Sequence, residues 1–273
     1  MIRRSHPALG RIRELRRSRS ARDADGVFLA EGIHLAKEAL GAGAEVETAV
    51  VSPRLATSAE GLALRRELER SGVPLLETTD TVLDSLADAR SPQPVLLIVR
   101  ARPSTREQAI EGRGGTVLLA VVHGVQDPGN LGTVLRTADA ASATGLVVAG
   151  EGADLRHPRA VRATAGSIFR LPAAVSRGDE IFPCLAARSI RCVGTAPRSS
   201  TDFTRVPLDG PVAIFLGGEG AGLPPSWLGR MDDTVRIPLH EGVESLSIGA
   251  AAAVLLFEVR RQRAALGLFS RGG

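Results

Sequence analysis

The C-terminal part of the chain alternates short apolar runs with segments of helical periodicity, and this alternation restricts its fold more than any other feature. Strands are expected at residues 117–122, 146–149, 192–195, 212–216 and 235–237. Helices are expected at residues 131–142, 158–166, 180–188 and 245–264. This order predicts an α/β domain whose parallel sheet is covered by helices on both faces.

A smaller α/β unit is expected ahead of this domain. Leu9, Ile12 and Leu15 recur at helical spacing among arginines, so residues 7–19 predict a basic amphipathic helix. Further strands are expected at 27–30, 46–51, 73–76 and 95–99, with helices at 33–40, 59–70 and 79–86.

The boundary between the two units is expected near residue 105. Residues 101–115 are polar, contain proline and several glycines, and lack sustained apolar periodicity, as is typical of a linker. A chain of 273 residues is also long enough for two compact domains. We therefore assign residues 1–105 to an N-terminal domain, 106–115 to a linker and 116–273 to a C-terminal domain.

The charge of the first 22 residues favours a nucleic-acid partner. Glu14 is the single acid there, against Arg3, Arg4, Arg11, Arg13, Arg16, Arg17, Arg19 and Arg22. Such a cluster suits a phosphate backbone, and Arg11, Arg16 and Arg17 are the candidate contacts. The alternative is compositional, because Lys37 is the only lysine and arginine is simply the basic residue of this chain.

Cysteine content and hydropathy indicate a cytoplasmic protein. Cys184 and Cys192 match no zinc or redox spacing and cannot form a disulfide framework for a chain of this length, so we expect no metal. The longest apolar run, at about 248–257, is much shorter than the ~20 residues of a membrane-spanning helix.

The first glycine-rich turn follows a predicted strand. Residues 123–132 read HGVQDPGNLG and lead into a helix that carries Arg136. Asn130 is expected to cap this helix, whose free N–H groups favour an anion, and Arg136 can reach back toward the same region. The alternative is that Asn130 is only a cap and Arg136 only a solvated side chain.

Two further segments follow later strands. Residues 215–224 contain four glycines around Glu219, at a spacing that differs from a dinucleotide-binding fingerprint. A carboxylate in such a loop can hold an amine, a hydroxyl or an arginine, although the segment can equally be a flexible surface loop. Residues 237–249 lead into an alanine-rich helix whose small residues permit close packing, in an ordinary core or where the chain is threaded.

Together and in this order, the three segments resemble the signature motifs of the SpoU (TrmH-type) family of the SPOUT superfamily of RNA methyltransferases. The resemblance rests on asparagine-x5-arginine, glycine-x-glutamate-x-x-glycine-leucine and isoleucine-proline-x6-serine-leucine, and it covers the C-terminal half. Residues 28–32 (FLAEG), behind a basic helix, are similar to the N-terminal RNA-binding domain of ribosomal-protein type that often precedes it.

The resemblance implies a C-terminal domain with a deep trefoil knot, an exception to the rule that chains avoid threading loops. It implies S-adenosyl-L-methionine as the cofactor, bound in the knot largely through backbone groups. Gly217, Ile237 and Leu246 would line this site, with Leu239 and Ser245 beside them. It also implies a homodimer formed through the knotted domain.

For the reaction, the resemblance implies that Arg136 acts on a ribose 2′-hydroxyl while Asn130 and Glu219 arrange the substrate. One position departs from the pattern, because many family members have asparagine where this chain has Ser247. The expected activity is ribose 2′-O-methylation of structured RNA, with ribosomal RNA favoured because an N-terminal RNA-binding domain is present. The alternatives are a transfer-RNA 2′-O-methyltransferase, a methyltransferase of base nitrogens, and a non-catalytic RNA-binding or ribosome-assembly factor.

Overall fold

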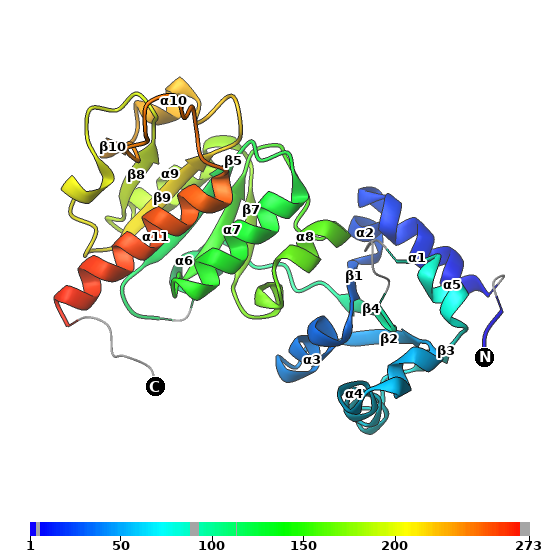
Figure 1. The fold of residues 1–273 in the computed structure, drawn as a ribbon. Coiled ribbons are helices and arrows are strands. Elements are labelled where there is room, and N and C mark those ends of the chain that lie inside the picture. Colours follow the sequence, from blue (N-terminus) through cyan, green and yellow to red (C-terminus); the bar gives the residue numbers. More distant parts are fainter. Residues whose placement is uncertain (4–5, 88–92, 113, 268–273) are drawn as a thin grey trace. The chain divides into compact units, whose positions relative to one another are not determined.

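The computed structural model describes residues 1–3, 6–87, 93–112 and 114–267, drawn in colour in Figure 1. The chain forms two compact units. Unit 1 contains Met1–Arg102 and Asp154–Arg170, and unit 2 contains Pro103–Ala153 and Leu171–Gly273. Among the described residues, no helix has the length and apolarity needed to cross a membrane.

Unit 1 is built on a mixed four-stranded sheet in the order β1-β4-β2-β3. Strand β4 is antiparallel to both its neighbours, whereas β2 and β3 are parallel. The strands are β1 (Val27–Glu31), β2 (Val46–Val51), β3 (Leu75–Glu77) and β4 (Val95–Arg100). The helices are α1 (Pro7–Arg17), α2 (Arg19–Asp25), α3 (Ile33–Gly41), α4 (Ala59–Arg70), α5 (Asp80–Asp84) and α8 (Pro158–Ala163), with 3-10 turns η1 (Pro53–Thr57) and η2 (Ser167–Phe169).

The expected basic helix is confirmed as α1. Its large apolar side chains, Leu9, Ile12 and Leu15, are buried against one face of the sheet. The helix ends at Ser18, whose hydroxyl accepts a hydrogen bond from the Ala21 N–H (3.1 Å) and so caps α2. Helix α2 was not predicted, because its sequence RSARDAD has no apolar periodicity.

Unit 2 contains a six-stranded, wholly parallel sheet in the order β10-β8-β9-β5-β6-β7, which confirms the predicted α/β class. The strands are β5 (Leu118–His123), β6 (Gly145–Ala149), β7 (Ala173–Ser176), β8 (Arg191–Thr195), β9 (Val212–Gly217) and β10 (Asp233–Val235). Strand β7 was not predicted, because it is a short edge strand in which Val175 is exposed.

Helices cover both faces of this sheet (Figure 1). They are α6 (Arg106–Glu111), α7 (Pro128–Ala140), α9 (Ile181–Ala186), α10 (Pro225–Leu228) and α11 (Ile248–Ala265), with 3-10 turns η3 (Gly178–Glu180) and η4 (Phe203–Arg205). Helices α6 and α9 pack on one face, and α7 and α11 lie side by side on the other. Strand pairing alone does not decide whether the chain is threaded, so the trefoil knot stays a prediction.

Part of the segment expected as a linker is a helix in unit 2. Residues 106–111 form α6, which begins with a capping box between Thr105 and Gln108. Ala109 and Ile110 are fully buried, and Gly145 of β6 lies so close that an added Cβ would be 2.3 Å from the Ala109 carbonyl oxygen. A six-residue helix is too short to show periodicity, which is why composition alone indicated a linker.

Candidate active site at the carboxyl ends of β5 and β9

The first two glycine-rich segments begin side by side. Strands β5 and β9 are parallel neighbours whose last residues, His123 and Gly217, are paired. The next residue, Gly218, donates its N–H to the His123 carbonyl oxygen (2.7 Å). In open α/β sheets, ligands bind at this carboxyl edge.

The glycines of the second segment are required by close backbone contacts. A Cβ on Gly218 would lie 2.2 Å from the Gly124 carbonyl oxygen, and one on Gly217 would lie 2.2 Å from the carbonyl carbon of Gly222. Gly218 and Gly222 also form an isolated bridge, with the Gly222 N–H donating to the Gly218 carbonyl (3.1 Å). The segment is therefore a tight, internally bonded turn.

The cap of α7 differs from the prediction. Asp127 is the N-cap, because its carboxylate accepts a hydrogen bond from the Asn130 N–H (3.0 Å). Pro128 takes the first helical position, where its missing N–H and fixed φ cost nothing. Asn130 thus lies in the first turn, and its side-chain amide donates a hydrogen bond to the Glu219 carboxylate.

Arg136 lies farther along α7 and is exposed. Within the part of the chain that the structure describes, it makes no hydrogen bond or ion pair. Six positions along a helix correspond to a rotation of roughly 120° from Asn130, so the two side chains leave α7 in different directions. Their shared pocket stays a prediction.

The third segment begins after β10 and leads to α11. The predicted helix begins at Ile248, not at residue 245, because the Ser247 hydroxyl accepts a hydrogen bond from the Ala250 N–H (3.3 Å) and caps it. Gly249 then packs against α7, since an added Cβ would lie 2.8 Å from Thr133 Cγ2. Helix α11 therefore starts beside the helix that carries Asn130.

The residues expected to line the cofactor site lie on or beside this third segment, apart from Gly217 at the end of β9. Ile237 is half-buried, whereas Leu239, Ser245 and Leu246 are exposed. Figure 1 shows the segment passing α10 before it enters α11 beside the end of β5.

These residues fit an adenosine-type cofactor. The glycine backbone at the end of β9 offers polar main-chain groups that suit the edge of an aromatic base. The exposed apolar side chains on the loop suit the faces of its ring. In the described ranges, no three His, Cys, Asp or Glu side chains come together as a metal site.

His123 is a residue of this edge to which we assigned no role from the sequence. Its ring packs edge-on against Trp227 with centroids 4.7 Å apart, and it also lies close to Gly150, where an added Cβ would be 3.3 Å from the ring. Burial lowers the pKa of His123, and the charge of Asp179 opposes this shift only in part. The imidazole is therefore neutral at physiological pH.

Besides Arg136, three arginines of α1 were expected to bind RNA, and they differ in their surroundings. Arg11 forms ion pairs with Asp25 (2.7 Å) and Glu47 (3.0 Å), so its charge is compensated within unit 1. The hydrogen bond to Asp25 is the main cause of its raised pKa. Arg16 is half-buried, and Arg17 is exposed at the end of α1.

The fold and site define an α/β protein whose C-terminal unit brings glycine-rich segments together at the carboxyl edge of a parallel sheet. The model of the SpoU rRNA Methylase family matches residues 117–257, and that of the MRM3-like substrate binding domain matches residues 7–97. The chain belongs to the SpoU rRNA methylase family.

Individual relatives are similar along most of the chain. The 23S rRNA (guanosine(2553)-2′-O)-methyltransferase RlmP of Bacillus subtilis is 28% identical over 89% of this chain and 92% of the relative. The SpoU methyltransferase AviRb from Streptomyces viridochromogenes, solved in complex with AdoMet, is 29% identical over 95% of this chain and 99% of that chain, with a TM-score of 0.86. The AdoMet-bound rRNA methyltransferase from Sinorhizobium meliloti is 30% identical over 96% of this chain and 97% of that chain, with a TM-score of 0.84.

Proposed function

We propose that this protein transfers a methyl group from S-adenosylmethionine to a ribose 2′-hydroxyl of ribosomal RNA. One observation carries the proposal: the Asn130–Glu219 hydrogen bond joins two signature segments of the SpoU family at the carboxyl ends of β5 and β9. This edge is where a parallel α/β sheet holds its ligand.

We place the cofactor between the end of β9 and the loop after β10. Gly217 contributes backbone, and the loop contributes Ile237, Leu239, Ser245 and Leu246. Two of these loop side chains, Leu239 and Leu246, are apolar and exposed, at 38% and 36%. When bound, S-adenosylmethionine supplies a methyl group on a positively charged sulfur, which is reactive toward an oxygen nucleophile.

Arg136 is the residue that we assign to the RNA ribose. A guanidinium has hydrogen-bond donors only and stays charged at neutral pH, so it is a poor base. We infer that Arg136 orients the 2′-hydroxyl and binds the adjacent phosphate, while Asn130 and Glu219 hold the loop around the substrate. The ribose oxygen forms a bond to the methyl carbon as the carbon–sulfur bond breaks, and the hydroxyl proton leaves late, to solvent.

The RNA class follows from unit 1 and the relatives. Residues 7–97 match a substrate-binding domain, and RlmP is named for action on 23S rRNA. We therefore favour ribosomal over transfer RNA. We also propose a cytoplasmic location, as the cysteine content and hydropathy of the sequence predict.

We also propose that the protein is a homodimer formed through unit 2. Val243 in the loop after β10 is 50% exposed, and Phe257 on α11 is 44% exposed. Large apolar side chains exposed to water on one unit are candidates for an association surface. Light scattering of the purified protein gives its mass and hence its oligomeric state.

The experiment that tests the activity is incubation with methyl-labelled S-adenosylmethionine and unmodified transcripts of 23S rRNA or of transfer RNA, followed by nucleoside analysis. A labelled 2′-O-methylnucleoside from the 23S transcript supports the proposal. A methylated base, or label only in transfer RNA, supports one of the other methyltransferases. Cofactor binding without methylation of any RNA supports the non-catalytic RNA-binding factor.

A further inference from the structure

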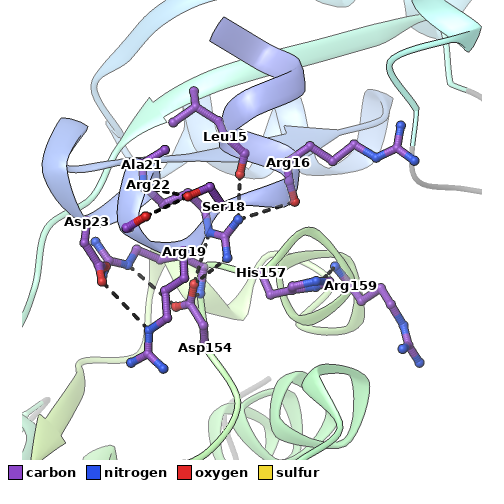
Figure 2. A network of polar contacts seen from close by, with 12 residues as sticks. Leu15, Arg16, Ser18, Arg19, Ala21, Arg22, Asp23, Asp154, His157 and Arg159 are labelled. Atoms are coloured by element: carbon purple, nitrogen blue, oxygen red, sulfur yellow. Dashed lines mark hydrogen bonds and ion pairs between the residues drawn. The ribbon is translucent and has the colours of Figure 1, made fainter.

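A buried arginine in unit 1 joins two segments far apart in sequence. The side chain of Arg22 is 2% exposed, and its Nη1 donates a hydrogen bond to the Leu15 carbonyl at the end of α1 (2.6 Å). Its Nε and Nη2 both donate to Asp154 Oδ2, at 3.0 and 2.9 Å, as Figure 2 shows. The guanidinium thus ties the last turn of α1 to a carboxylate 132 positions later.

Asp154 in turn fixes the start of α8. Its other carboxylate oxygen accepts the Arg156 N–H (2.9 Å), and its carbonyl accepts the His157 N–H (3.0 Å). The Arg156 guanidinium forms an ion pair with Asp23 of α2. The first turn of α8 is therefore held at the corner between α1 and α2.

Packing of α8 determines which of its side chains face solvent. Ala160 and Val161 are fully buried, and Val161 belongs to the same core as Phe28 of β1. Arg159 and Arg162, one turn apart, are exposed. One side of α8 is thus apolar and packed, and the other carries arginines.

The resulting surface combines arginines from both segments. Arg17 and Arg19 are exposed at the α1–α2 corner, where the Arg22–Asp154 and Asp23–Arg156 contacts hold the start of α8. Figure 2 shows the side chains of Arg16 and Arg159 extending away from the buried Arg22–Asp154 pair. Asp154 pairs with Arg22, and Asp23 pairs with both Arg156 and Arg19 (3.8 Å). The arginines at this corner outnumber these two aspartates, so the named side chains carry a net positive charge.

We propose that this corner binds the phosphodiester backbone of RNA, with Arg159 and Arg162 as contacts in addition to Arg16 and Arg17. The inference rests on the proposed function and deepens it. Guanidinium groups suit phosphate because they offer paired donors and a permanent charge. Residues 154–170 lie within the span that matches the SpoU methylase model, yet they pack in unit 1. The RNA surface of unit 1 is therefore completed by a segment inserted between β6 and β7.

The test is a double substitution, Arg159→Gln with Arg162→Gln, compared with Arg66→Gln plus Arg70→Gln on α4. All four side chains are exposed on helices of unit 1, so both variants should fold, which circular dichroism checks. Binding of an unmodified 23S rRNA transcript is measured over a range of salt concentrations. Each phosphate contact contributes roughly 0.7–0.9 to the slope of log K against log salt.

We expect the α8 variant to bind roughly tenfold more weakly at about 0.1 M salt, with a salt slope shallower by roughly 1.5. Its methylation should show a raised KM for RNA and an unchanged kcat, and the α4 variant should match wild type. Wild-type affinity and slope in the α8 variant, or an equal loss in both variants, would overturn the proposal. Failure of the proposed function is a separate result, because wild-type protein would then not methylate the transcript.

Discussion

The Asn130 side-chain amide donates a hydrogen bond to the Glu219 carboxylate, across 89 positions of sequence. Their loops leave adjacent parallel strands at the paired residues His123 and Gly217. The contact therefore fixes the separation of two loops at the edge where the substrate is proposed to bind. A neutral amide is suited to this place, because it offers a donor to the carboxylate without adding a second negative charge.

Replacing Asn130 with aspartate should separate these loops. The Asn130→Asp variant is nearly isosteric but places a second carboxylate against Glu219, and like charges at hydrogen-bond distance repel. A displacement of about 1 Å in a reacting group costs roughly a hundredfold in rate, so we expect a loss of that order in single-turnover methylation. Glu219→Gln keeps a carbonyl acceptor and should lose far less. Equal rates for Asn130→Asp and wild type would show that the Asn130–Glu219 hydrogen bond is not needed for methyl transfer.

Arg136 should be needed for methyl transfer but not for cofactor binding. It is exposed on α7 and has no partner among the residues described, so its loss leaves the fold intact. We expect Arg136→Ala to abolish labelling of RNA while the dissociation constant for S-adenosylmethionine, measured by calorimetry, stays within about twofold. Arg136→Lys keeps the charge but not the paired donors, and should recover only part of the rate. Near-wild-type turnover in the alanine variant contradicts the assigned role.

The parallel sheet could be predicted because its buried strands are continuous apolar runs in the sequence. The glycine-rich segments of the site could be predicted because they directly follow those strands. The cap of α7 was assigned wrongly, because Asp127 and Asn130 are both good caps and Pro128 decides between them. The helix at 158–166 was expected, but its place in unit 1 was not. That placement depends on tertiary contacts, such as Phe169 stacking on Phe28 (5.9 Å), which leave no periodic signal.

Gly218 should tolerate no side chain. Its φ is ordinary, so the constraint is steric: an added Cβ would lie 2.2 Å from the backbone oxygen of Gly124. We expect Gly218→Ala to force the two loops apart, lowering the free energy of unfolding by about 1–3 kcal/mol and weakening cofactor binding. Gly210, ahead of β9, has open space around it, and Gly210→Ala is the matched control. Urea denaturation compares the two, and equal stabilities would show that the loop adjusts freely.

The main role of Ser247 should be to cap helix α11. Its hydroxyl accepts the Ala250 N–H, and asparagine at the same position can cap equally well. Ser247→Ala should lower stability by about 1 kcal/mol, whereas Ser247→Asn should be close to neutral and retain methylation. Thermal unfolding and a methylation assay on the same samples provide both readouts. A large gain of activity in Ser247→Asn would instead assign the amide a role beyond capping.

His123 should make unit 2 less stable in mild acid. Burial lowers its pKa in the fold below the ordinary value of 6.5, so the unfolded chain takes up a proton more readily than the folded one. The free energy of unfolding should therefore fall as pH drops through about 6.5 and level off below the folded-state pKa. His123→Phe keeps a ring against Trp227 and removes the titration, so this component of the pH dependence should disappear. The measurement is the fluorescence of Trp227 during urea unfolding. Trp227 is the single tryptophan and packs on the His123 ring, so its fluorescence reports on this region. Identical pH profiles for the variant and wild type would show that other groups cause the acid sensitivity.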